Sequence, residues 1–113
     1  MEIKRGDIWL VNLDPTVVHE IKKSRPAVII QNDIGNKYSP ITIIAPITSQ
    51  NTETIYPTEV FIMSGQSGLE KDSKILLNQI RAVDQIRLIK KLGMINELTI
   101  ERLNEAIKIS LGL

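Results

Sequence analysis

The amino-acid sequence predicts one mainly β domain that ends in a helix, and three observations indicate it. The chain has 113 residues, which is the size of one ordinary domain. Twenty of these residues are isoleucine, and β-branched side chains fit the pleated, half-buried surface of a sheet. From Leu98 onwards the spacing of apolar residues changes to a helical period. We therefore expect strands first and a helix last.

Five short runs of apolar and β-branched residues predict the strands. They cover residues 7–13, 27–31, 41–48, 58–62 and 74–83. Turn-forming residues such as Asp14-Pro15, Ile34-Gly35-Asn36 and the Ser64–Gly68 segment separate them. Residues 27–30 and 41–45 are almost wholly apolar, as expected for strands covered on both faces inside a small barrel. Closure of such a barrel also hides the edges of the sheet.

The C-terminal segment is predicted to form an amphipathic helix. Its apolar residues recur near helical spacing at Leu98, Leu103, Ala106, Ile107 and Leu111. Asn96 or Thr99 can cap this helix, which runs to about Leu111. Residues 84–87 are predicted to form a single helical turn. One domain then spans residues 1–113, with the barrel over about 1–95 and the helix over about 97–111.

The composition excludes several kinds of site. The chain has no cysteine, which excludes disulfides, a thiolate nucleophile and cysteine-based metal sites. His19 is the only histidine, so metal sites and acid–base pairs built on several imidazoles are excluded as well. The formal net charge is +1, so any site for a polyanion must be local.

Two basic stretches are candidates for such a local site. Residues 71–91 contain six basic and two acidic side chains, and Lys22, Lys23 and Arg25 form a second group. If both lie on one face, they would attract phosphates. The alternative is an ordinary solvated surface.

The sequence also predicts where the chain resides. The first seven residues reach charged side chains before any apolar run of signal-peptide length. The longest uncharged stretch, residues 38–52, is too short and too polar to span a bilayer. We therefore expect a cytoplasmic protein without a membrane span.

Three single positions are candidates for contacts with phosphates or bases. Arg25 precedes Pro26, which biases it towards an extended backbone, and its guanidinium either clamps a phosphate or covers apolar surface. Thr48 ends the third predicted strand, where its hydroxyl either donates to a phosphoryl oxygen or caps a turn. Gln79 is predicted in mid-strand beside Asn78, where one of the two amides either reads a base edge or bonds to core backbone.

Four separated motifs resemble the MazF/PemK family of toxin endoribonucleases, nearly from end to end. They are Arg5-Gly-Asp-Ile-Trp-Leu-Val-Asn-Leu-Asp-Pro-Thr16, Glu20 followed by Arg25-Pro-Ala-Val-Ile-Ile30, Ile44-Ala-Pro-Ile-Thr48, and Ser73-Lys-Ile-Leu-Leu-Asn-Gln-Ile-Arg81. The resemblance implies a small SH3-like β-barrel, shared with the gyrase poison CcdB, and a homodimer. It also implies sequence-specific cleavage of single-stranded RNA without metal or cofactor, and neutralisation by a MazE-like antitoxin.

The resemblance also implies roles for individual residues. Arg25 and Thr48 match the catalytic pair of the family, and Glu20 matches an acidic residue tied to activity. Family members hold RNA near the positions of Gln79 and Asn32. The two basic stretches add Lys22, Lys23 and Arg81 to the predicted RNA-binding set. One departure is Val18, because the family usually has glycine there.

Cleavage by the neighbouring 2′-hydroxyl needs a proton acceptor, positive charge for the phosphorane and a proton for the departing 5′-oxygen. Arg25 fits the electrostatic role, Glu20 is the more natural base, and Thr48 can bond a nonbridging oxygen. Family accounts also assign acid–base work to the arginine. The competing hypotheses are a noncatalytic CcdB-like barrel that poisons a protein such as gyrase, and an RNA-binding module without cleavage.

Overall fold

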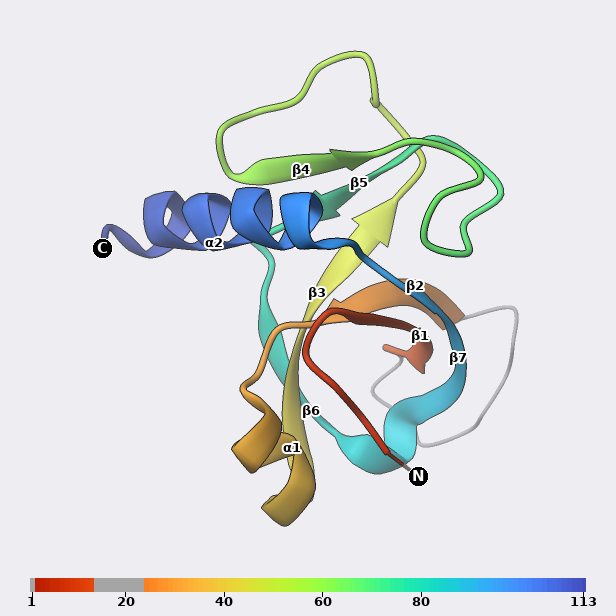
Figure 1. Ribbon diagram of the computed structural model, residues 1–113, viewed down its shortest axis with the longest axis vertical. Helices are drawn as coiled ribbons and strands as arrows, with labels where there is room; N and C mark the ends of the chain where they lie inside the picture. Colours follow the sequence, from red (N-terminus) through yellow and green to blue (C-terminus); the bar gives the residue numbers. More distant parts are fainter. Residues whose placement is uncertain (1, 14–23) are drawn as a thin grey trace.

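The computed structural model describes residues 2–13 and 24–113. Its helices and strands, drawn in Figure 1, are β1 (Asp7–Asn12), β2 (Ser24–Ile29), α1 (Asp33–Tyr38), β3 (Ile41–Thr48), β4 (Glu59–Ile62), β5 (Ser73–Leu76), β6 (Arg81–Asp84), the 3-10 turn η2 (Gln85–Arg87), β7 (Leu88–Met94) and α2 (Glu97–Leu111). The prediction of a mainly β fold with a C-terminal helix is confirmed. Over these ranges, no helix has the length and apolar character needed to cross a membrane.

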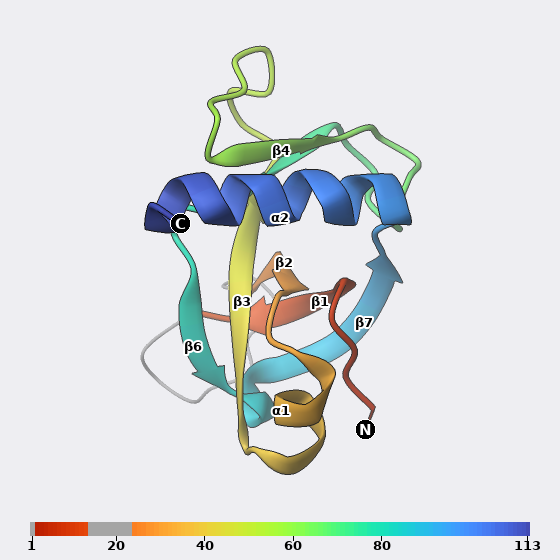
Figure 2. The same ribbon diagram turned by 60° about the vertical axis from the view of Figure 1, so that its left-hand side comes forward.

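The strands form one strongly curved, barrel-like sheet. Its order is β4-β5-β3-β2-β1-β7, every pairing is antiparallel, and β6 also pairs with β3. Helix α2 lies alongside β4, and α1 lies at the opposite end of β3, as Figures 1 and 2 show from two sides. The hydrogen-bonded path between β4 and β7 does not close.

The core consists of two apolar clusters, one on each face of the central strands. Ile8 and Val28 belong to the cluster that also contains Leu103 of α2, whereas Trp9 and Ile29 belong to the other. Successive side chains of a strand point to opposite faces, so a strand between two clusters must be apolar at every position. This confirms the expectation for residues 27–30, Ile44 and Ala45, whereas Ile41 is exposed and Thr42 is a buried polar residue.

The predicted strand over residues 74–83 is wrong as a single element. A turn at residues 77–79 divides it into β5 and β6. Ile47 pairs with Ile75 and Ile44 pairs with Arg81. The chain therefore advances by three positions along β3, from Ile44 to Ile47, but by six positions from Ile75 to Arg81. The three additional residues form the turn. This turn lets β5 pair with β4 while β6 continues along β3.

Two elements were not predicted. Helix α1 has only six residues, and its backbone is held by a distant side chain, because Gln85 Nε2 donates to the carbonyls of Asn36 and Ser39 at 2.9 Å each. Strand β7 carries Lys90 and Lys91, which interrupt its apolar pattern, and its pairing with β1 contains two register irregularities. The sequences of α1 and β7 therefore have no local pattern that would predict a helix or a strand.

The predictions of a C-terminal helix and of a helical turn at residues 84–87 are confirmed. Helix α2 starts directly after Asn96, whose side chain accepts a hydrogen bond from Thr99 N at 2.8 Å. It ends at Gly112, which has a φ of 71°, a left-handed conformation that favours glycine. Asp84 caps the predicted helical turn, which the structure places at η2.

Candidate active site

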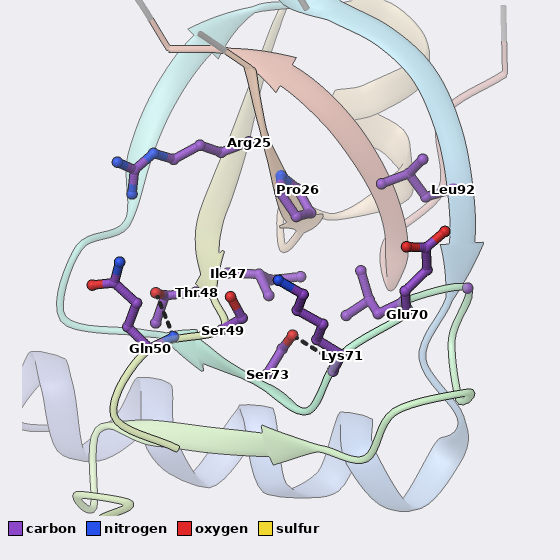
Figure 3. Close-up of a pocket in the computed structure, with 12 residues that line it drawn as sticks. Arg25, Pro26, Ile47, Thr48, Ser49, Gln50, Glu70, Lys71, Ser73 and Leu92 are labelled. Carbon is purple, nitrogen blue, oxygen red and sulfur yellow. Dashed lines mark hydrogen bonds between the residues drawn. The ribbon is translucent and has the colours of Figure 1, made fainter. Parts of the chain in front are cut away.

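Arg25 and Thr48 line the same pocket, which has a volume of about 470 Å³. Four parts of the chain form its walls (Figure 3). They are the start of β2, the end of β3 with Ser49 and Gln50, the loop between β4 and β5, and Leu92 of β7. The structure therefore brings together the two residues that the resemblance identifies as a catalytic pair.

The sheet explains why Arg25 and Thr48 are close. Ala27 pairs with Pro46, so continuing this register by two residues puts Arg25 level with Thr48. Arg25 also pairs with Val11 of β1, which fixes its backbone from the other side. Its side chain is exposed and, within residues 2–13 and 24–113, makes no hydrogen bond or ion pair. The guanidinium is thus available to bind an anion.

The position of Thr48 is compatible with both roles considered for it. Its Oγ1 accepts a hydrogen bond from Gln50 N at 3.2 Å, which stabilises the turn after β3 (Figure 3). A hydroxyl group that accepts one bond still carries a proton that it can donate. Thr48 can therefore cap the turn and donate to a phosphoryl oxygen at the same time.

The loop over residues 63–72, which we call the β4–β5 loop, supplies the wall opposite Arg25. Gly68 lies against β7 so closely that a Cβ there would be 2.1 Å from the carbonyl oxygen of Leu92. A Cβ on Gly93 would likewise be 2.2 Å from the carbonyl oxygen of Ser67. Only glycine allows two backbones to approach this closely, so the two glycines dock the loop on β7.

Docking of this loop brings Glu70 and Lys71 to the pocket, neither of which the sequence analysis identified as a site residue. The sequence places Lys71 in a basic stretch and residues 64–68 in a turn, and neither feature indicates a site. No sequence signal places this loop beside Arg25, because its position depends on contact with β7.

The predicted RNA-binding residues that the structure describes lie outside the pocket lining. Gln79 is exposed in the turn after β5, so its predicted mid-strand position, like that of Asn78, is wrong. Arg81 is exposed on β6. Asn32 caps α1, and its Oδ1 accepts a hydrogen bond from Gly35 N at 2.8 Å. Helix α1 lies at one end of β3 (Figure 2), whereas Thr48 is at the other end.

Five positions discussed above lie outside the described residues. They are Val18, His19, Glu20, Lys22 and Lys23. In the part of the chain that is described, no three acidic, histidine or cysteine side chains gather as a possible metal site.

Comparison with known proteins identifies the family. Residues 4–111 match the family model described as PemK-like, MazF-like toxin of type II toxin-antitoxin system. The chain is 43% identical over 113 residues to endoribonuclease EndoA of Bacillus subtilis, covering 100% of this chain and 97% of that protein. It is 47% identical over 111 residues to endoribonuclease MazF of Staphylococcus saprophyticus, covering 98% and 92%.

Solved structures share the fold. A mycobacterial endoribonuclease in complex with its cognate antitoxin superposes with a TM-score of 0.82 at 20% identity, covering 98% of this chain and 96% of that one. MazF from Deinococcus radiodurans superposes with a TM-score of 0.80 at 21% identity, covering 100% and 99%. The sequence matches and the shared fold agree, and the chain belongs to the family of PemK-like, MazF-like toxins of type II toxin–antitoxin systems.

Proposed function

We propose that this protein is a toxin endoribonuclease that cleaves single-stranded RNA at specific sequences in the cytoplasm and is neutralised by a MazE-like antitoxin. The observation that carries the proposal is the pocket shared by Arg25 and Thr48. It lies in a chain that is 43% and 47% identical to proteins named endoribonucleases. A mycobacterial endoribonuclease of the same fold is in complex with its antitoxin, which supports the proposed partner.

The proposed reaction uses the RNA itself as the nucleophile. The 2′-oxygen attacks the adjacent phosphorus and gives its proton to a base, for which Glu20 is the proposed residue. The bond between phosphorus and the 5′-oxygen then breaks, and that oxygen takes up a proton. The products are a 2′,3′-cyclic phosphate and a 5′-hydroxyl end.

Arg25 and Thr48 are proposed to stabilise the transition state. Negative charge develops on the nonbridging oxygens as the phosphorane forms, and a guanidinium whose backbone is fixed at the pocket by strand pairing stabilises this charge. Thr48 donates a hydrogen bond to one of these oxygens. We propose that the strand leaves the pocket along β3 past Gln79 and Arg81, with Asn32, Lys22 and Lys23 as further contacts.

The experiment is incubation of the purified protein with mixed-sequence single-stranded RNA in the presence of EDTA, followed by mapping of the ends. We expect cleavage at one sequence with cyclic phosphate ends, because the proposed chemistry requires no metal. The matched control carries a 2′-deoxy nucleotide at the cleaved position and should stay intact, since it lacks the nucleophile. Intact RNA with the folded protein would contradict the proposal and favour a CcdB-like action on a protein. Loss of cleavage in EDTA would contradict metal independence.

A further inference from the structure

Lys71 differs from the neighbouring lysine of β5 in a way that suggests a ligand. Lys74 is buried, and its Nζ donates to Glu59 Oε1 at 2.9 Å and to the carbonyl of Thr54 at 3.1 Å. Lys71 is exposed and lines the Arg25 pocket. Among the residues that the structure describes, its ammonium group has no hydrogen-bond or ion-pair partner. One lysine thus stabilises the fold, and the other presents an uncompensated charge.

The side chain of Lys71 points into the pocket, as Figure 3 shows. The guanidinium of Arg25 lies on the other side, near Thr48 and Gln50. The neighbouring carboxylate of Glu70 points away from Lys71, towards Leu92 of β7 (Figure 3). Two cationic groups therefore face one open pocket from opposite walls.

The backbone around Lys71 is held on both sides. Ser73 Oγ donates to the carbonyl oxygen of Lys71 at 2.9 Å, and Asp72 Oδ1 accepts from Ser64 N at 2.7 Å. The docking of Gly68 against Gly93 fixes the other end of the loop. Because the backbone is already ordered, less conformational entropy is lost when the ammonium binds an anion.

We propose that Lys71 binds a phosphate of the RNA next to the one that Arg25 holds, and so fixes the direction of the strand across the pocket. This inference rests on the proposed function, and it adds a substrate-positioning residue that the family motifs do not contain. A single RNA strand presents successive phosphates, so cations on opposite walls suit two neighbouring ones. A lysine binds a phosphate as a point charge and needs no fixed orientation.

The proposal predicts a particular kinetic signature. A contact that is equally strong in the bound substrate and in the transition state affects KM and leaves kcat unchanged. Replacing one phosphate contact should also lower the salt dependence of binding, by about 0.7 in the slope of log K against log salt for a single strand. A merely structural role of Lys71 would not change this slope.

The experiment compares Lys71→Gln, Lys71→Arg and the native protein, with Lys108→Gln as the matched control. Lys108 lies on α2 and outside the pocket, in an exposed pair with Glu105. Binding is measured between about 50 and 200 mM salt on a labelled RNA with a 2′-deoxy nucleotide at the cleaved position. Where the native protein cuts no RNA, the probe is mixed-sequence single-stranded RNA. Cleavage kinetics and far-UV circular dichroism are recorded in parallel.

We expect Lys71→Gln to bind RNA about tenfold more weakly at low salt and to show a smaller slope of log K against log salt. Its KM should be higher, and its kcat should stay within about twofold of the native value. Lys71→Arg should restore binding, and Lys108→Gln should match the native protein. An unchanged slope, a fall in kcat at unchanged KM, or no RNA binding by the native protein would overturn the inference. If the native protein binds RNA but does not cleave it, the proposed function is overturned but the inference about Lys71 is not. The salt dependence of RNA binding by Lys71→Gln then still decides whether Lys71 contacts a phosphate.

Discussion

At the scale of single residues, Arg25 is the position where a substitution should separate activity from stability. Its side chain is exposed and has no partner within the described ranges. We expect Arg25→Ala to lower the cleavage rate by about 100-fold to 1000-fold, because one preorganised electrostatic contact contributes that much. Far-UV circular dichroism and the urea midpoint should stay unchanged.

The control for this variant is Arg102→Ala, which removes another exposed arginine, on α2. It should retain the native cleavage rate. Equal activity of the two variants would mean that the charge of Arg25 is not used in the reaction.

Asn32 caps α1 and is also a predicted RNA contact, and substitutions at this position can separate the two roles. Because its side chain caps α1, we expect Asn32→Ala to lower the free energy of unfolding by about 1 kcal/mol. Asp is an equally good cap but has no amide protons to donate, so Asn32→Asp should keep the stability measured by urea unfolding.

The RNA affinity of Asn32→Asp then tests the predicted contact. Weaker binding of a stable variant that persists at high salt, where the added charge of Asp is screened, supports contact with RNA, and native binding contradicts it.

The site residues that could be predicted from the sequence are those tied to a local feature of the chain. Arg25 stands directly before a proline and Thr48 at the end of an apolar run, which made both candidates, and the family resemblance pairs them as catalytic residues. The structure places them together. Lys71 could not be found in this way. Its approach to the pocket depends on the contact of Gly68 with Gly93, two residues that are far apart in the sequence.

At the scale of elements, the correct predictions are again those that rest on a local sequence pattern, and the wrong ones concern elements that depend on distant contacts. Strand β3 and helix α2 have complete patterns of their own and were predicted within about two residues. Both β5 and β6 pair with β3, but only β5 also pairs with β4, and no local pattern reveals this difference. Helix α1 depends on Gln85, which follows it by about 50 residues.

Removal of one partner of the buried ion pair between β4 and β5 should be strongly destabilising. Lys74 Nζ and Glu59 Oε1 are 2.9 Å apart, with side chains 5% and 9% exposed, and the same oxygen accepts from Tyr56 N at 3.0 Å. Lys74→Met leaves the carboxylate buried without its cation. We expect the free energy of unfolding, measured with urea, to fall by about 3–5 kcal/mol.

The matched control is Lys90→Met, at an exposed position of β7. Surface substitutions of this kind change stability by no more than about 0.5 kcal/mol. A similar small effect at Lys74 would show that the pair contributes little to the folded state.

At the scale of the whole molecule, the chain exposes large apolar side chains at the end that contains α1. Ile34 and Tyr38 are 75% and 76% exposed, and Ile86 is 59% exposed. Exposed apolar surface of this kind favours association, and the family resemblance implies a homodimer. We expect sedimentation at micromolar concentration to give about twice the monomer mass of 12.7 kDa. A mass that stays at the monomer value over a dilution series would contradict this expectation.

The pairing of β1 with β7 delays the formation of the site during synthesis. These strands are neighbours in the sheet, although Asp7 and Met94 stand near opposite ends of the chain. At 5–20 residues per second, a ribosome needs roughly 4 to 17 seconds to pass from one to the other. Leu92 is part of the pocket wall, and the loop that carries Lys71 docks on Gly93. A nascent chain therefore has no complete pocket before β7 has been translated, and the proposed cleavage begins only after that point.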